Sequence, residues 1–270
     1  MRAGALVFAV ALLAIFQYSV RAFVPGELEP GGFTLSNFVA MMKPVYGGVF
    51  LDTVLICAYT AIASLFAGYP LALALVRTPS ARLRSALLII AVTPLFLGEV
   101  VRTYSWIVVL GANGFINSVL MGLGIVDRPV QLMFTTFGVV VALVHVTLPL
   151  VVIMTAAGIA HIDPAYEKAA LSLGARRMRV FLTITLPLSM PGVLAAVTTV
   201  FAWTFSAFAT PQLIGGGKVN MVSNLVYQLG FASFNFPFAA ALSVAGLALT
   251  IVTLALLRIL TRPLARLGPH

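Results

Sequence analysis

The sequence predicts an all-α, polytopic membrane protein with six transmembrane helices in a single domain, residues 1–270. Composition is the first reason: hydrophobic residues make up 61% of the chain, charged residues make up 9%, and the mean hydropathy is +1.10. About a quarter of a typical soluble chain is charged. The second reason is that the apolar residues come in long runs, and about 20 such residues cross a bilayer core of about 30 Å.

Six apolar runs are long enough to be transmembrane spans. The expected spans are residues 3–20, 49–76, 85–110, 136–159, 191–214 and 238–260. Several prolines fall inside these runs or near their ends: Pro70, Pro94, Pro149 and Pro211. Transmembrane helices tolerate proline where neighbouring helices or water satisfy the freed backbone groups. The prolines are therefore compatible with a helix in each run.

The first run also resembles a signal peptide, because Arg2 precedes an apolar stretch. However, the 18 residues of the run 3–20 exceed a usual signal h-region, and no small-residue cleavage site follows before Arg21. We therefore expect a retained first helix.

The placement of Lys and Arg predicts the orientation. Most of the 16 Lys and Arg residues fall on one side of the expected spans: Arg2, Arg77, Arg82, Arg84, Lys168, Arg176, Arg177, Arg179, Arg258, Arg262 and Arg266. Fewer fall on the opposite side: Arg21, Lys43, Arg128 and Lys218. Because the side rich in Lys and Arg stays in the cytoplasm, both termini and residues 160–187 are expected there. The net charge of +9 then reflects this bias and contact with the lipid bilayer, and it does not indicate nucleic-acid binding.

The loop between the fourth and fifth spans, residues 160–187, is the longest stretch dense in charge. Asp163 and Pro164 are typical of a helix start, and Gly174 is typical of a helix end. A second short helix is expected over about 175–183. The pattern predicts a helix–Gly–helix elbow along the membrane surface, although it also fits an ordinary amphipathic loop held at the lipid headgroups by its arginines.

The spacing within this loop resembles a known signature. Lys168-Ala169-Ala170, Gly174, Ile184 and Leu186-Pro187 match the register of the EAA loop in permease subunits of binding-protein-dependent ABC importers. The resemblance implies that the loop is a coupling helix that docks on an ATPase. The residues implied in this coupling are Asp163, Glu167, Lys168, Ala169, Ala170, Leu173, Gly174, Arg176 and Arg177.

One position of the loop departs from this signature. The family usually has Glu directly before the two alanines, where this chain has Lys168. Glu167, one position earlier, is the candidate for the same role. The departure leaves open which group of the partner each side chain would meet.

Three further segments resemble the spermidine/putrescine-type permeases within that family: 102–114, 210–216 and 235–240. The resemblance implies a multi-pass protein of the bacterial inner membrane. Its implied partners are two ATPase subunits, a second and usually different permease subunit, and a periplasmic substrate-binding protein. ATP and Mg would be used by the ATPases, and this chain would bind no cofactor. The cargo would be a polyamine or related amine, an opine or a phosphonate-like compound.

Polar residues at span depth are functional candidates, because burying them in a membrane is costly. Glu99 and Arg102 lie three positions apart and so share a helix face, which suits either a structural ion pair or a pathway lining. In a pathway, Glu99 would attract a cation, or Arg102 would attract a carboxylate or phosphonate. The other pathway candidates are Tyr104, Trp106, Trp203 and Thr204.

Other polar positions have structural interpretations. The lone His145 is expected to be a hydrogen-bonded interior residue, and Asp52 suits either a helix N-cap or a vestibule charge. Gly215-Gly216-Gly217-Lys218 lacks the spacing of a P-loop. We find no carboxylate pair, metal cluster or Ser/His/Asp set, so catalysis and metal binding by this chain are not expected. Cys57 is the only cysteine, which excludes an internal disulfide.

Two other classes of protein fit parts of the sequence. An ion-coupled secondary transporter would show inverted repeats and a midplane ion site, and neither is evident in the sequence. A non-transporting membrane scaffold would have no reason to keep the loop 160–187 in this register. Copurification with ATPase subunits separates an importer from both alternatives.

Overall fold

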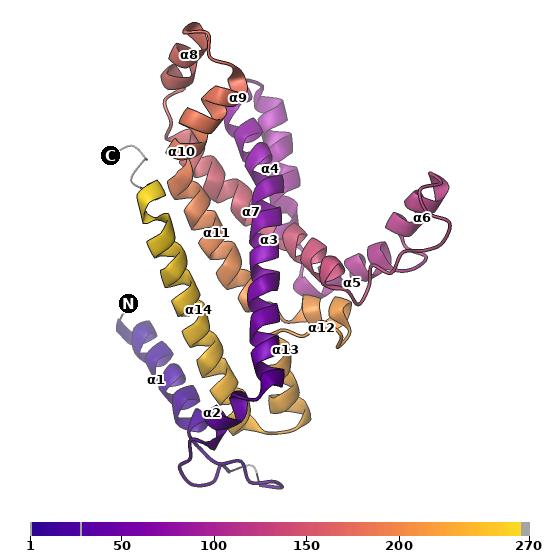
Figure 1. The fold of residues 1–270 in the computed structure, drawn as a ribbon, viewed down its shortest axis with the longest axis vertical. Helices are drawn as coiled ribbons and strands as arrows, with labels where there is room; N and C mark the ends of the chain where they lie inside the picture. The colour runs from indigo at the N-terminus through magenta and orange to yellow at the C-terminus, as the bar shows by residue number, and fades with distance from the viewer. Residues whose placement is uncertain (1, 28, 266–270) are drawn as a thin grey trace.

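The computed structural model describes residues 2–27 and 29–265, and these form one elongated bundle of helices (Figure 1). Within that range no β-strand forms, apart from a single antiparallel bridge between Arg21 and Phe33. The predicted all-α class is therefore confirmed for the described part of the chain.

Four long helices coincide with expected spans. They are α1 (Arg2–Ser19), α3 (Pro44–Arg77), α7 (Thr136–Ala160) and α14 (Phe236–Ala265). Within the described residues, four helical stretches are long and apolar enough to cross a membrane: Pro44–Arg77, Glu99–Gly122, Thr136–Ala160 and Phe236–Ile259. A fifth is added if Arg177–Leu188 and Met190–Phe205, which meet at a bend of 66°, count as one span.

The expected third span, 85–110, is broken rather than continuous. It consists of α4 (Ala81–Phe96) and α5 (Glu99–Leu110), and the chain is extended at Leu97 and Gly98 between them. Glycine is a poor helix former, and Gly98 lets the chain leave one helix and enter the next.

The expected fifth span, 191–214, is also broken. It consists of α11 (Met190–Phe205) and α12 (Ala209–Gly215), separated by residues 206–208. Pro211 lies two residues into α12, where its ring would clash with the carbonyl of Ala207 if the helix continued. The proline therefore accounts for the break.

The connection from α7 to α11 contains the expected elbow. It runs through α8 (Pro164–Ser172), α9 (Arg177–Val180), the π-helix η1 (Phe181–Thr185) and α10 (Leu186–Leu188). The second helix, expected over 175–183, therefore continues to Leu188. Pro187 and Pro191 both lack a backbone N–H, which explains why the helix widens in η1 and bends at Ser189.

Short helices also form in the loops on the other side of the expected spans from the elbow. These are α2 (Ser36–Met41), α6 (Phe115–Gly122), α13 (Val222–Tyr227) and the π-helix η2 (Gln228–Ala232). Figure 1 shows α6 at the tip of an arm, beyond α5, that extends away from the bundle.

The core of the bundle lies around α7, and half of the apolar stretch of this helix is buried inside the protein. The hydroxyl oxygens of Ser64 and Thr147 are 2.7 Å apart, and this hydrogen bond joins α3 to α7. α7 and α11 approach most closely at Gly158 and Gly192, where a Cβ added to Gly158 would lie 2.9 Å from the Gly192 Cα. Small residues at such crossings let membrane helices pack backbone to backbone.

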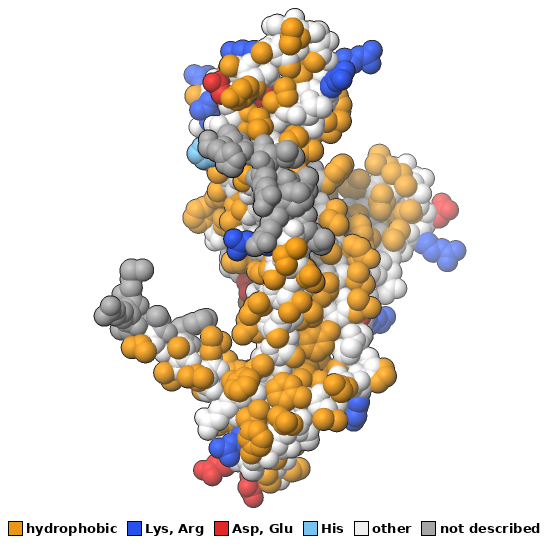
Figure 2. Space-filling model, turned by 60° about the vertical axis from the view of Figure 1, so that its left-hand side comes forward, with side chains coloured by type: hydrophobic (Ala, Val, Ile, Leu, Met, Phe, Trp, Pro, Cys, Tyr) orange, Lys and Arg blue, Asp and Glu red, His pale blue; other side chains and the backbone are white. Residues whose placement is uncertain are grey.

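The charge distribution agrees with the sequence pattern. Lys and Arg side chains gather at the end of the molecule that carries α8 (Figure 2). Arg77 at the end of α3, Arg82 at the start of α4 and the arginines of the elbow all belong to this end. Arg266, which contributes to the predicted orientation, lies outside the described residues.

We predict that Gly158→Ala destabilises the bundle by about 1–3 kcal/mol, because the added methyl group meets backbone atoms of α11 that cannot move aside. Cys57 is the only cysteine and is fully buried, so a thiol-reactive dye reports unfolding during a thermal ramp. Gly47→Ala is the matched control, since its Cβ meets nothing within 4 Å. Equal unfolding midpoints for the two variants would contradict the close packing of α7 on α11.

Candidate functional site

The elbow, residues 163–180, has a helix start and a helix end built as the sequence predicts. The Asp163 side chain accepts a hydrogen bond of 2.8 Å from the backbone N–H of Ala165. Gly174 has a φ of +83°, and the backbone N–H groups of Gly174 and Ala175 donate to the carbonyls of Leu171 and Ala170. This is a Schellman ending, which favours glycine at the left-handed position.

The outer face of the elbow is exposed and combines apolar and cationic side chains. Leu173 is 89% exposed at its tip, and Tyr166 is exposed as well. Lys168, Arg176 and Arg177 are exposed as well. Large apolar side chains rimmed by charge are typical of a protein–protein contact.

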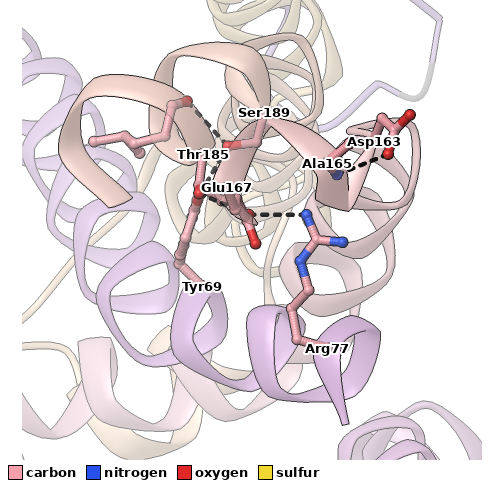
Figure 3. A network of polar contacts seen from close by, with 8 residues as sticks. Tyr69, Arg77, Asp163, Ala165, Glu167, Thr185 and Ser189 are labelled. Atoms are coloured by element: carbon pink, nitrogen blue, oxygen red, sulfur yellow. Dashed lines mark hydrogen bonds and ion pairs between the residues drawn. The ribbon is translucent and has the colours of Figure 1, made fainter. Parts of the chain in front are cut away.

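The inner face of the elbow is held by a polar network (Figure 3). Oε1 of Glu167 accepts a bond of 2.9 Å from Nη2 of Arg77 and a bond of 2.8 Å from the Thr185 hydroxyl. One carboxylate oxygen thus joins α8, the end of α3 and η1. We call Arg77, Glu167 and Thr185 the latch.

A second contact lies beside the latch. The Tyr69 and Ser189 hydroxyl oxygens are 2.8 Å apart (Figure 3). The Tyr69 ring also meets the Phe181 ring edge-on, with the ring centroids 5.5 Å apart. Ser189 is the residue at which the chain bends into α11. Both contacts therefore fix the base of α11 against α3.

A separate cavity lies where the two broken spans face each other. Its volume is about 300 Å³, and Glu99, Arg102, Trp203, Ser206 and Thr210 contribute its polar and aromatic lining. Leu143 and Val146 of α7 complete one wall. Irregular backbone at membrane depth is tolerated where it lines a cavity, as it does here.

The Arg102 side chain makes hydrogen bonds to the backbone at the break between α4 and α5. Its side chain is 8% exposed, and Nη1 donates to the carbonyls of Pro94 at 2.9 Å and Leu97 at 3.3 Å. The guanidinium therefore satisfies carbonyls at the end of α4, where a cation also suits the helix dipole. Of the two interpretations of Glu99 and Arg102, the structural ion pair does not form as a direct contact between these two described residues, and Arg102 donates to the backbone instead.

Glu99 begins α5, where a carboxylate suits the helix dipole. Its side chain and the half-exposed Trp203 both face the cavity. Within the described part of the chain, neither of these two side chains makes a hydrogen bond, and Glu99 is exposed.

The remaining pathway candidates lie elsewhere. Tyr104 is exposed on α5, outside the cavity lining. Trp106 donates from Nε1 to Nδ1 of His145 at 3.2 Å, which confirms the expectation that His145 is hydrogen-bonded in the interior. The Thr204 hydroxyl is buried without a hydrogen-bond partner among the described residues and does not line the cavity.

The structure settles the interpretation of one further polar residue, Asp52. Asp52 is not a helix N-cap, because α3 already begins at Pro44 and the Asp52 side chain is exposed in its third turn. Among the residues that the structure describes, no group of three or more His, Cys, Asp or Glu side chains is arranged to hold a metal ion.

The latch was only partly visible in the sequence. Glu167 belongs to the loop signature, but Arg77 precedes it by 90 positions. Thr185 is a common residue type in an apolar stretch, so nothing in the sequence marked it. Both residues were missed.

Comparison with known proteins gives consistent matches. The family profile described as "Binding-protein-dependent transport system inner membrane component" matches residues 64–266. The chain is 32% identical over 212 residues to the spermidine/putrescine transport system permease protein PotB of Salmonella typhimurium (strain SL1344), an alignment that covers 78% of this chain and 74% of that protein.

Solved structures share the fold. A bacterial alginate ABC transporter in complex with an alginate pentasaccharide-bound periplasmic protein matches with a TM-score of 0.74 at 18% identity, over 97% of this chain and 89% of that chain. The MetNI methionine ABC transporter in an inward-facing conformation matches with a TM-score of 0.60 at 18% identity, over 85% of this chain and 99% of that chain.

We predict that Arg102→Gln lowers stability by about 1–3 kcal/mol, because it leaves the carbonyls of Pro94 and Leu97 buried with weaker donors. Thermal unfolding followed through Cys57 measures the effect. Arg128→Gln, an exposed loop arginine, is the control for lost charge. If both variants unfold like the unmodified protein, Arg102 does not support the break.

Proposed function

The chain belongs to the family of inner membrane components of binding-protein-dependent transport systems, and we propose on this premise that it is the ATP-driven permease subunit of an ABC importer. It carries a small polar solute from the periplasm to the cytoplasm. The observation that carries this proposal is the elbow, whose outer face exposes Leu173 and Lys168 while its inner face is tied to α3 and η1.

In this proposal the whole chain is one transmembrane domain with six spans. The third and fifth spans are the broken pairs α4–α5 and α11–α12. The basic end, with the elbow and both termini, faces the cytoplasm because Lys and Arg favour that side. The protein resides in the bacterial inner membrane.

The elbow is the coupling helix between α7 and α11. An ATPase subunit receives the exposed Leu173 in an apolar groove, and Lys168, Arg176 and Arg177 meet acidic groups at the rim of that groove. Ala169 and Ala170 allow close approach, because their side chains are small. Asp163 and Gly174 fix where the helix of the elbow begins and ends.

The proposed assembly contains two ATPase subunits, a second and different permease subunit and a periplasmic substrate-binding protein. ATP and Mg are bound and used by the ATPases, and this chain binds no cofactor. Closure of the ATPases pushes the elbow. Since α7 and α11 flank the elbow and also line the cavity, the push reaches the membrane pathway.

The cavity favours a cationic cargo. Arg102 also lines the cavity, but its Nη1 donates to the carbonyls of Pro94 and Leu97, which holds this cation against the end of α4. Glu99 and the indole of Trp203 remain, and a carboxylate beside an aromatic face suits an ammonium group. Together with the spermidine/putrescine function in the name of PotB, this favours a polyamine or related amine over an opine or a phosphonate-like compound.

A test of the importer proposal is to purify the chain with the products of neighbouring genes, place the complex in nanodiscs, and measure ATP hydrolysis with and without the loaded binding protein. We expect stimulation by one loaded solute, which also identifies the cargo. Absence of any associated ATPase would favour the alternative, an ion-coupled secondary transporter.

We predict that Gly174→Asp abolishes stimulation of ATP hydrolysis by the loaded binding protein. A left-handed backbone costs a residue with a Cβ about 1–2 kcal/mol, and the new carboxylate adds the wrong charge to the cationic tip. Gly26→Asp is the matched control, because Gly26 also has a positive φ and an open Cβ position but lies in the loop at the opposite end. Intact stimulation in Gly174→Asp would count against docking at the elbow.

We predict that Glu99→Gln raises the polyamine concentration needed for half-maximal uptake by about tenfold or more, since hydrogen bonds to charged groups contribute about 1.5–3 kcal/mol. The measurement is uptake of radiolabelled putrescine or spermidine into proteoliposomes. Glu27→Gln, which removes a carboxylate from an exposed loop, is the control. Unchanged uptake in Glu99→Gln would exclude Glu99 from cargo recognition.

A further inference from the structure

We propose that the latch of Arg77, Glu167 and Thr185 makes the elbow, the end of α3 and the base of α11 move as one body, so that Arg77 and Thr185 are positioning residues for coupling. The inference rests on the proposed importer function. It assigns roles to two residues that lie outside the loop signature, and it reassigns Glu167 from contact with a partner to a contact within the chain.

Three elements meet at a single oxygen in the latch. Oε1 of Glu167 accepts from Arg77 at 2.9 Å and from Thr185 at 2.8 Å (Figure 3). The side chains of Arg77 and Glu167 are only 23% and 20% exposed, and Nε of Arg77 is buried. Water and salt therefore screen this ion pair less than one on an open surface.

Apolar packing alone does not join α8 to the bundle. A hollow of about 440 Å³ lies beneath the elbow, lined by Leu73, Leu171, Phe181 and the three latch residues. Within α8 no residue is buried. Among the described residues, the latch supplies the side-chain hydrogen bonds and the ion pair that join α8 to α3 and η1, and a force on α8 reaches these elements through it.

The connections at both ends of α8 are bends in the chain. A force on α8 would otherwise rotate this helix about these bends and would not move α3 and η1. Residues 161–163 form a turn after α7, and residues 173–176 separate α8 from α9. Without the latch, α8 is free to pivot about these points. With it, a push on α8 moves α3 and the bend at Ser189, where Tyr69 makes its own contact.

Glu167 and Lys168 consequently have different tasks. The Glu167 carboxylate points to its own chain, whereas Lys168 is exposed on the outer face. Loss of Glu167 should therefore impair coupling, and loss of Lys168 should impair association with the ATPase.

The test uses the complete complex in proteoliposomes and measures solute transported per ATP hydrolysed, together with the amount of ATPase that copurifies. For Arg77→Gln and Glu167→Gln we expect normal copurification and an approximately tenfold lower ratio of transport to hydrolysis. Thr185→Val should lower the ratio less, because the ion pair remains. The exchange Arg77→Glu with Glu167→Arg should recover most of the ratio, which a purely local defect in folding would not.

Matched controls separate the latch from other effects. Arg82→Gln removes an exposed positive charge from the same end of the molecule and should leave the ratio unchanged. Unchanged ratios in both latch variants, or no recovery in the exchanged pair, would overturn the proposal. Loss of copurified ATPase in Glu167→Gln alone would show that Glu167 is a docking residue. If the unmodified chain recruits no ATPase, the importer function itself fails, which is a different outcome.

Discussion

A helix that is interrupted inside a membrane must satisfy its freed backbone groups within the protein, because lipid offers no hydrogen bonds. Most of the distinctive features of this chain follow from that constraint. The break between α4 and α5 exists because Arg102 lies close enough to donate to the carbonyls of Pro94 and Leu97. That guanidinium also lines the polar cavity, where Glu99 is the other charged side chain.

The elbow and the cavity are connected by the same two helices. α7 ends at the elbow and lines the cavity with Leu143 and Val146, and α11 begins after the elbow and lines it with Trp203. A helix of 16 residues such as α11 spans about 24 Å, so it bridges much of a bilayer core. The glycine contact between Gly158 and Gly192 makes these two helices a closely packed pair. The latch joins α3 to this pair of helices at the basic end of the molecule. Under our proposal, a displacement of α8 is therefore transmitted through these helices toward the cavity.

The sequence predicts some of these features well and others not at all. Run length and hydropathy locate α1, α3, α7 and α14, since these helices are continuous. The elbow is predicted in detail, because Asp163, Pro164 and Gly174 act through local backbone geometry. The breaks at residues 97–98 and 206–208 are missed, since hydropathy does not change there.

Contacts between distant residues are the part that a single sequence does not reveal. The i, i+3 spacing of Glu99 and Arg102 suggests a pair, yet the guanidinium finds backbone carbonyls that only the fold brings near. Arg77 and Thr185 meet Glu167 only because α3, α8 and η1 converge. Roles in docking and cargo recognition remain predictions.

Uptake into proteoliposomes that contain the full complex and the binding protein shows most directly whether ATP hydrolysis by partner ATPases at the elbow drives solute through this chain. We expect uptake to require ATP on the side of the membrane that carries the elbow, and to continue when ionophores dissipate the proton and sodium gradients. Uptake that proceeds without ATP and stops with the ionophores would contradict this expectation.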